Sequence, residues 1–160
     1  MKRFAGRISH ILLALSIITF LFGCGPKQNG TDTSGNGANT GLRYVDNEVC
    51  LEVRTGRMWQ TVKGGSFSSL QEAEKYTQSL ELGGYADWRL PTRDELFSLH
   101  YIFFWEKNGD CAMNRTGEYW SVSEGEKATP GHWETYFLCN PEYKYVNSLR
   151  KKGYVRAVRP

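Results

Sequence analysis

The stretch GGYADWRLPTRDEL, residues 83–96, contains the densest local structural signals in this sequence. Pro91 ends any hydrogen-bonded run and holds the preceding residue in extended geometry, so a short strand is predicted before it. Thr92 and Glu95 have the spacing of a capping box, in which each side chain satisfies a backbone N–H at a helix start. The stretch therefore predicts a short strand that leads directly into a helix. The helical residues expected to face the core are Leu96, Leu99 and Ile102.

Trp88 and Arg89, within the same stretch, are expected to build structure and not to bind a ligand. A large aromatic side chain among apolar neighbours buries much area and is more often a core residue than a ligand platform. A half-buried arginine needs a carboxylate partner, so a structural ion pair is the expected role of Arg89. The candidate partners are Asp87, Asp94 and Asp110. We interpret the whole stretch as architectural.

The flanking segments predict an α+β fold. Alternating apolar residues on both sides of Gly56 favour a β-hairpin. Ser69 and Glu72 have capping spacing and begin an earlier helix, which is expected to end at the glycines of positions 83–84. Two early helices followed by short antiparallel strands are typical of this fold class. The β-rich segments of the last third are residues 117–124, 135–139 and 154–160.

The N-terminus predicts an export signal. Three basic residues, Lys2, Arg3 and Arg7, precede a short apolar run at residues 11–22. This order is typical of a secretory signal peptide, and the run falls short of the roughly 20 residues that a spanning helix needs. A short transmembrane anchor is the alternative. Removal of the signal leaves 17 of the 20 basic residues to balance 17 acidic ones, so the net basic charge belongs to the signal.

The residues Leu21-Phe22-Gly23-Cys24 resemble the lipobox of bacterial lipoproteins. The resemblance implies cleavage before Cys24, acylation of Cys24 with palmitate-type chains, and attachment to a membrane of the bacterial cell envelope. Because residue 25 is Gly and not Asp, it also implies the outer membrane.

Residues 25–41 are dominated by Gly, Asn, Thr and Ser and lack large apolar side chains. Such a segment cannot build a core and predicts a flexible tether, whose 17 residues would reach roughly 20–25 Å. The expected organisation is a signal peptide at 1–23, an acylated cysteine and linker at 24–41, and one domain at 42–160.

Four motifs occur in the domain in this order: TGRMW (55–59), YADWRLPTRDEL (85–96), YWS (119–121) and YVRAVR (154–159). Together they resemble the Lcl C-terminal domain family over most of residues 42–160. That family looks related to the C-type-lectin-like and formylglycine-generating-enzyme superfold, which implies a twisted antiparallel sheet with two helices. The resemblance also implies a surface-displayed module, with glycan or glycosaminoglycan binding in some members.

Cys50, Cys111 and Cys139 remain after acylation of Cys24, and in an oxidising compartment this odd number permits one disulfide and one free thiol. We expect a Cys111–Cys139 bridge, which would clamp the irregular segment around Cys111 onto a strand. Pairing of Cys50 with either of the other two is the alternative, because sequence cannot settle connectivity.

No catalytic residue, cofactor or metal site is predicted. His100 and His132 are the histidines outside the signal peptide, and both are expected to be structural or surface residues. The chain has no paired CxxC, no HxxxH and no acidic calcium loop. A thiol- or copper-dependent oxidase related to the formylglycine-generating enzymes is an alternative, and it would require two reduced cysteines close together.

The C-terminal segment concentrates positive charge. Six basic residues follow Tyr143 with no acidic residue among them. They could attract a sulfated or phosphorylated polysaccharide. The alternative is a solvated turn at Arg150–Lys152 with structural roles for Arg156 and Arg159. The basic residues are Lys144, Arg150, Lys151, Lys152, Arg156 and Arg159, and the candidate ligand-binding residues are Arg150, Lys151, Lys152, Trp133, His132, Tyr143 and Tyr145.

These observations predict a non-enzymatic, adhesin-like envelope lipoprotein whose lectin-like domain binds a carbohydrate or another envelope component. A structural module of envelope assembly is a further alternative. Nucleic acid is not an expected partner of an exported lipoprotein.

Overall fold

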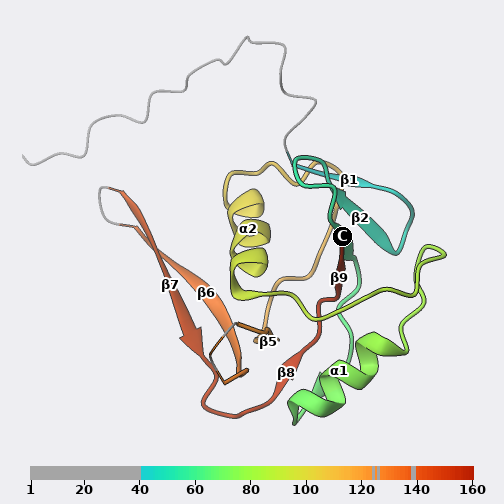
Figure 1. Ribbon diagram of the computed structural model, residues 1–160. Coiled ribbons are helices and arrows are strands. Elements are labelled where there is room, and N and C mark those ends of the chain that lie inside the picture. Colours follow the sequence, from blue (N-terminus) through green and yellow to red (C-terminus); the bar gives the residue numbers. More distant parts are fainter. Residues whose placement is uncertain (1–40, 124, 126, 138–139) are drawn as a thin grey trace, which may run out of the picture. The chain divides into compact units, whose positions relative to one another are not determined.

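The computed structural model describes residues 41–123, 125, 127–137 and 140–160, which form two sheets and two helices (Figure 1). The first sheet has the strand order β1-β2-β3-β9 and is antiparallel throughout. The second has the order β4-β8-β5-β6-β7, in which only the β5–β8 pair is parallel. The α+β fold class is confirmed.

Most strands are short, and the β6–β7 hairpin is the longest paired unit of the described chain. The strands are Leu42–Tyr44 (β1), Val49–Glu52 (β2), Met58–Gln60 (β3), Ser66–Phe67 (β4), Tyr119–Trp120 (β5), Pro130–Phe137 (β6), Pro141–Asn147 (β7), Gly153–Tyr154 (β8) and Val158–Arg159 (β9). The helices are Leu70–Gln78 (α1) and Arg93–Phe104 (α2).

Local signals account for both helix starts and for the first hairpin. The Ser69 hydroxyl accepts the backbone N–H of Glu72 at the start of α1. Thr92 and Glu95 form a reciprocal capping box at the start of α2. Gly56 has a φ of +80° in the turn between β2 and β3, a conformation that glycine adopts without steric cost. All three predictions are confirmed.

Helix α1 is shorter than predicted and ends at Gln78 instead of the two glycines. The Ser79 hydroxyl donates to the Tyr76 carbonyl over 3.0 Å, and a serine that bonds the local backbone competes with helix continuation. The glycines of positions 83–84, both with positive φ, instead form a tight turn. Their neighbours Leu82 and Tyr85 exchange backbone hydrogen bonds across that turn.

Strand β7 was not predicted from the sequence. Pro141 lacks a backbone N–H, but it begins an edge strand, where a missing ladder donor is tolerated. The strand pairs with β6 along its length and places Trp133 opposite Tyr145.

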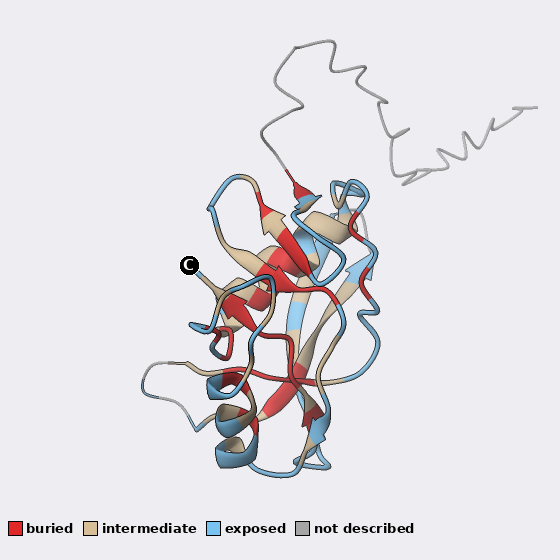
Figure 2. Cartoon of the chain, turned by 90° about the vertical axis from the view of Figure 1, so that its right-hand side faces the viewer, coloured by how far each residue is buried: buried red, intermediate tan, exposed pale blue. Residues whose placement is uncertain are grey.

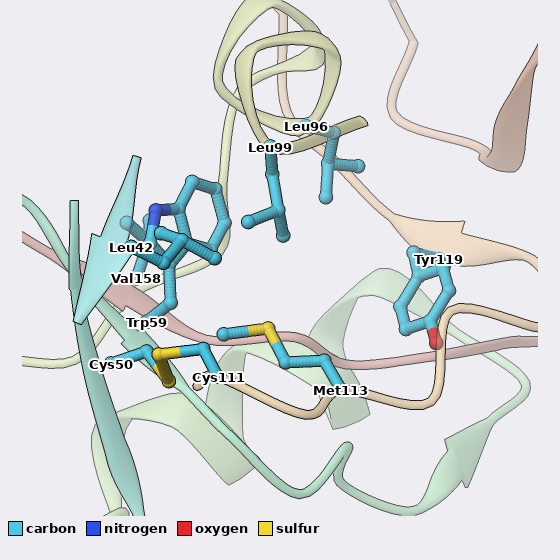
Figure 3. Packing of buried hydrophobic residues seen from close by; sticks show 9 residues of the cluster. All are labelled: Leu42, Cys50, Trp59, Leu96, Leu99, Cys111, Met113, Tyr119 and Val158. Carbon is cyan, nitrogen blue, oxygen red and sulfur yellow. A yellow bond between two sulfur atoms is a disulfide. The ribbon is translucent and has the colours of Figure 1, made fainter. Parts of the chain in front are cut away.

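Two buried clusters form the core of the described domain. The first lies between α2 and the first sheet and contains Trp59 and Leu99 (Figure 3). The second contains Trp88, which is 3% exposed, so its predicted role as a core residue is confirmed. Residues 155–158, which are fully buried or nearly so, run from β8 to β9 and connect the two sheets. Figure 2 shows buried segments along the central strands and an exposed outer face on α1.

Cys111 forms a disulfide with Cys50, with 6.3 Å between their Cα atoms. The expected Cys111–Cys139 bridge is therefore wrong, and the alternative that included Cys50 is the one observed; Cys139 lies outside the described residues. The chain after α2 turns back against β2, which brings together two buried cysteines 61 residues apart in sequence.

Candidate functional site

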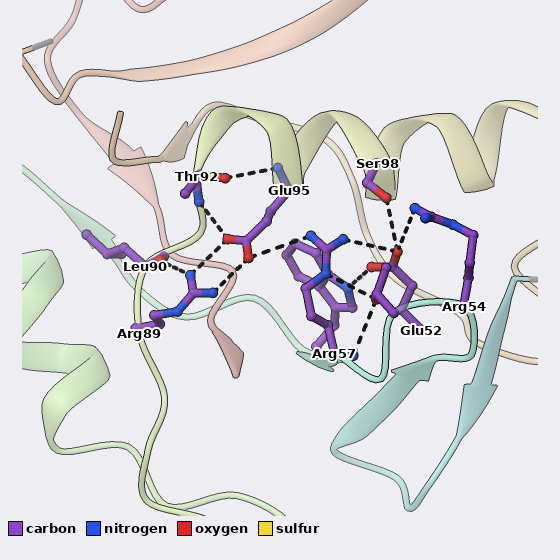
Figure 4. A network of polar contacts seen from close by, with 10 residues as sticks. Glu52, Arg54, Arg57, Arg89, Leu90, Thr92, Glu95 and Ser98 are labelled. Atoms are coloured by element: carbon purple, nitrogen blue, oxygen red, sulfur yellow. Dashed lines mark hydrogen bonds and ion pairs between the residues drawn. The ribbon is translucent and has the colours of Figure 1, made fainter. Parts of the chain in front are cut away.

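The side chains of the 83–96 stretch are occupied by structural interactions (Figure 4). Arg89 donates hydrogen bonds of 2.7 and 2.8 Å to the two carboxylate oxygens of Glu95. The expected partners of Arg89 are therefore wrong, because the capping box turns the Glu95 carboxylate back toward the strand that precedes α2. Burial raises the pKa of Glu95, but hydrogen bonds from Arg89 and Thr92 hold it below its usual range.

A second carboxylate, Glu52 on β2, extends this network. Glu52 is fully buried and accepts hydrogen bonds from the Trp59 indole over 3.1 Å and the Ser98 hydroxyl over 3.0 Å. The guanidinium of Arg57 lies 3.5 Å from Glu52 and 3.6 Å from Glu95. The network joins β2 to the first half of α2 and stabilises the fold (Figure 4).

Two members of the basic C-terminal segment are also structural. Arg156 is buried, and its guanidinium donates to the backbone carbonyls of Gln60 over 2.9 Å, Thr61 and Asn114. Burial lowers its pKa from the usual value. Arg159 forms an ion pair of 2.6 Å with Asp87. The basic residues that remain for a ligand are those of β7 and the turn that follows it.

The predicted aromatic ligand residues pack against α2 and do not form an open platform. Trp133, Tyr143 and Tyr145 alternate onto the same face of the β6–β7 hairpin and are half-buried. The ring of Trp133 lies 5.4 Å from that of Tyr145 and 4.7 Å from that of Phe97 on α2. Its indole donates to the Arg93 carbonyl over 3.1 Å.

The other predicted residues lie elsewhere. His132 occupies the opposite strand face from Trp133, and its Nε2 lies 2.9 Å from Glu134. Arg150, Lys151 and Lys152 are exposed in the turn between β7 and β8. The structure therefore does not gather the seven predicted residues into one site.

A cavity of about 80 Å³ brings His132 and Trp133 together with residues that the sequence did not indicate. It lies between the core-facing side of α2, the start of β6 and the segment before β5. Its lining residues are Leu96, Leu99, His100, Arg115, Tyr119, Gly131, His132, Trp133 and Arg156.

We call this space the basic cavity because Arg and His side chains line it, although Arg156 is already bonded to backbone carbonyls and His132 to Glu134. Its lining includes His100, Arg115, His132 and Arg156, and none of the described lining residues is acidic. The Nδ1 atom of His132 is buried without a hydrogen-bond partner among the described residues. His100 bonds Thr135 through a 2.8 Å contact, and burial, reinforced by the charges of Arg115 and His132, lowers its pKa below the usual 6.5. An anionic group would complement these side chains.

No sequence pattern marks His100, Arg115 and Arg156 as a group. They come from α2, from the segment before β5 and from the segment between β8 and β9, so only the tertiary fold places them around one space. The YVRAVR motif is equally compatible with a buried arginine and with a ligand-binding one. The backbone carbonyls that Arg156 contacts cannot be identified from the sequence.

A second candidate surface lies at the C-terminal end of α2, where several aromatic rings are in contact with one another and exposed to solvent. Ring centroids are 5.9 Å apart for Tyr101 and Trp105, 5.1 Å for Phe104 and Trp105, and 5.4 Å for Phe104 and Phe137. Phe137 is 72% exposed, and Tyr101, Trp105 and Tyr136 are 40–44% exposed. Tyr136 alternates onto the other face of β6 and bonds Glu134, so it does not belong to this cluster. We call Tyr101, Phe104, Trp105 and Phe137 the aromatic surface.

The described part of the chain offers no group of three or more His, Cys, Asp or Glu side chains that could hold a metal ion. Cys50 and Cys111 are joined to each other, so they do not supply the pair of reduced thiols that the oxidase alternative requires. Among the same described residues, neither helix is long and apolar enough to cross a membrane.

Comparison with known proteins gives one match. The family model described as the Lcl C-terminal domain matches residues 48–159, which is more than half of the chain. No curated protein and no solved structure matches the sequence.

Proposed function

The chain belongs to the Lcl C-terminal domain family, and from this premise we propose that it is a non-enzymatic binding module of the bacterial cell envelope. Its ligand is a carbohydrate with acidic substituents, such as a sulfated or uronic-acid-containing polysaccharide. The C-type-lectin-like fold predicted from the family resemblance is part of this proposal.

The basic cavity beside α2 is the observation that supports this proposal. Arg115 and two histidines line it without an acidic residue among its described lining, and His132 Nδ1 has no hydrogen-bond partner in the described part of the chain. Native proteins rarely leave a buried polar atom unpaired, so an unpaired nitrogen at a cavity favours a missing ligand or water. Arg is well suited to bind carboxylate and sulfate oxygens through paired N–H groups.

The size of the cavity limits what enters it. A volume of about 80 Å³ is far below the roughly 300–1,000 Å³ of sites that enclose a whole ligand. One acidic substituent would therefore occupy the cavity, while the sugar ring stays outside it. This geometry suits a long polymer that presents many similar groups, each bound weakly.

The test is a binding panel on the mature chain with sulfated, uronic-acid-containing and neutral polysaccharides. We expect salt-sensitive binding to the acidic polymers only. Arg115→Gln should weaken it by about tenfold or more, as expected for loss of a hydrogen bond to a charged group. The matched control replaces Arg150, Lys151 and Lys152 with glutamine, which removes more charge but none from the cavity.

The two variants separate the candidate sites. A loss of binding in the triple variant with no change in Arg115→Gln would move the site to the turn after β7. No binding to any polymer, together with stoichiometric co-purification of another envelope protein, would favour the assembly-module alternative.

We also propose that the domain is held at the outer membrane by an acylated Cys24. The lipobox-like residues before Cys24 and the Gly-, Asn- and Thr-rich segment after it support this arrangement. The intact mass of the protein purified from bacterial membranes tests it directly. A mature chain that begins at Cys24 with added acyl mass is expected, and an unmodified N-terminus would contradict the anchor.

A further inference from the structure

The proposed carbohydrate site does not account for the exposure of the aromatic surface. Of its four residues, Phe137 comes from β6, Tyr101 and Phe104 come from the C-terminal end of α2, and Trp105 is the C-cap of that helix. None of them lines the basic cavity. Grouped exposed aromatic side chains mark interaction sites more often than isolated ones do.

The chain enters the domain beside this surface. The backbone N–H of Leu42 donates to the Lys107 carbonyl over 3.1 Å, and Lys107 in turn bonds the carbonyl of Ile102 in α2. Lys107 is two residues from Trp105. Figure 1 shows the start of β1, the C-terminal end of α2 and the far end of the β6–β7 hairpin at the same end of the domain.

We propose that the aromatic surface docks on the lipid bilayer to which the chain is anchored. This inference rests on the proposed acylation of Cys24. The segment between Cys24 and the domain has a predicted reach of roughly 20–25 Å, which is less than the diameter expected for a domain of this size, whose radius of gyration is about 14 Å. On average, the end of the domain that carries residue 41 is therefore the end held nearest the membrane.

The side chains fit the membrane interface. Trp and Tyr concentrate at lipid headgroups, because each ring has an apolar body and a polar edge that stays hydrated. A short flexible link keeps the surface at a millimolar effective concentration relative to the bilayer, so a weak apolar contact is enough to populate the docked state.

Charge contributes little to this docking. Near the surface, Lys107 and Lys144 are offset by Glu106, Glu134 and Glu142, and the Tyr136 hydroxyl donates to Glu134. Docking should therefore depend on the apolar rings and change little with the fraction of anionic lipid. This weak dependence on charge distinguishes the docking from the salt-sensitive binding expected at the basic cavity.

The experiment uses the mature chain purified from bacterial membranes, with its acyl state measured by intact mass. The protein is reconstituted into vesicles of phosphatidylethanolamine and phosphatidylglycerol with either ordinary or brominated acyl chains, because bromine quenches nearby indoles. Trp105 is the most exposed of the five tryptophans; Trp59, Trp88 and Trp120 are buried, and Trp133 is half-buried.

We expect brominated lipids to reduce the Trp105 emission roughly twofold, since interfacial side chains reach the boundary of the acyl region. Trp105→Phe should abolish the quenching, and the matched variant Trp133→Phe should keep it. Phe137→Ser should weaken the quenching while Trp105 itself is retained.

The outcomes are distinct. If the chain is acylated but brominated lipids quench the wild type and Trp105→Phe equally, the docking proposal is refuted. The proposed lipid anchor is unaffected by that result. If Trp105 is shielded from solvent without being quenched by bromine, and if the shielding grows with protein concentration, the surface binds a second copy of the chain. That result also overturns the docking on lipid. An unacylated N-terminus removes the anchor and the docking together, and it leaves the carbohydrate site to its own test.

Discussion

The two ends of α2 are held in the fold by different interactions: hydrogen bonds and ion pairs at one end, and aromatic packing and a disulfide at the other. At its N-terminal end, Arg89, Thr92 and Glu95 form a closed set of hydrogen bonds, and the neighbouring Glu52 carboxylate is fully buried. At its C-terminal end, aromatic rings pack against β6 and β7, and the chain just beyond is fixed to β2 by the Cys50–Cys111 bridge. The first end is polar and satisfied internally, whereas the second leaves apolar rings in contact with solvent.

The difference separates structural roles from interaction roles within one helix. A polar group that is already paired in the fold has little left to offer a ligand, so the N-terminal end specifies architecture. The rings at the C-terminal end bury only part of their area, and contact with a further surface would bury the rest.

The largest expected effect is at the N-terminal end. Glu52→Ala should lower the free energy of unfolding by about 3–5 kcal/mol, because removal of one member of a buried charged network leaves its partners unsatisfied. Urea denaturation followed by tryptophan fluorescence measures the change. Arg54→Ala is the matched control, since its side chain is 65% exposed and 3.6 Å from the same carboxylate. If Arg54→Ala lowered the free energy of unfolding as much as Glu52→Ala does, burial of Glu52 would not be the reason for the large effect.

Removal of the bridge tests the covalent support of the C-terminal end. Cys50→Ala combined with Cys111→Ala should cost about 2–4 kcal/mol, because the disulfide restricts the unfolded chain. A non-reducing peptide map of the wild-type protein checks the pairing first. A peptide that links Cys111 to Cys139 would refute the observed connectivity.

A smaller effect should come from pH. The folded pKa of His100 lies below 6.5, so under acidic conditions the unfolded chain binds more protons than the folded one. The free energy of unfolding should therefore fall as the pH drops below 6.5 and on toward the lowered pKa. His100→Gln should show a shallower decline over the same window in urea titrations. An identical pH profile in both proteins would mean that the folded state does not perturb His100.

The smallest effect should come from the exposed rings. Phe137→Ser should change the free energy of unfolding by no more than about 0.5 kcal/mol, as is usual for exposed positions. The same variant should weaken the quenching by brominated lipids. A large loss of stability would show that the ring supports the fold, and it would weaken the contrast between the two ends of α2.

Sequence predicted the elements whose signals are local. The Thr92–Glu95 capping box, the Ser69 cap and the Gly56 turn depend on residues a few positions apart, and all three were found. The two features that were missed have no short motif that marks them. Strand β7 exists because β6 provides its ladder, and α1 ends early because a serine bonds its own backbone.

The candidate site was harder to predict than the fold. His132 and Trp133 were expected to contribute, and they line the cavity, but Arg115 and His100 have no sequence pattern that marks them. The cysteine pairing failed for a similar reason, because 61 residues separate the bonded pair and proximity along the chain gave no guide. Local chemistry identifies residue types, while only the packing of α2 on β6 decides which of them meet.

The buried run from β8 to β9 also constrains when the domain can fold. Gly153–Tyr154 lies between β4 and β5 in one sheet, and Val158–Arg159 completes the other. During synthesis these residues leave the ribosome after every other element of the domain, so neither sheet can close on a nascent chain that lacks them. We therefore expect both sheets to close late, only after residues 153–159 have been synthesised.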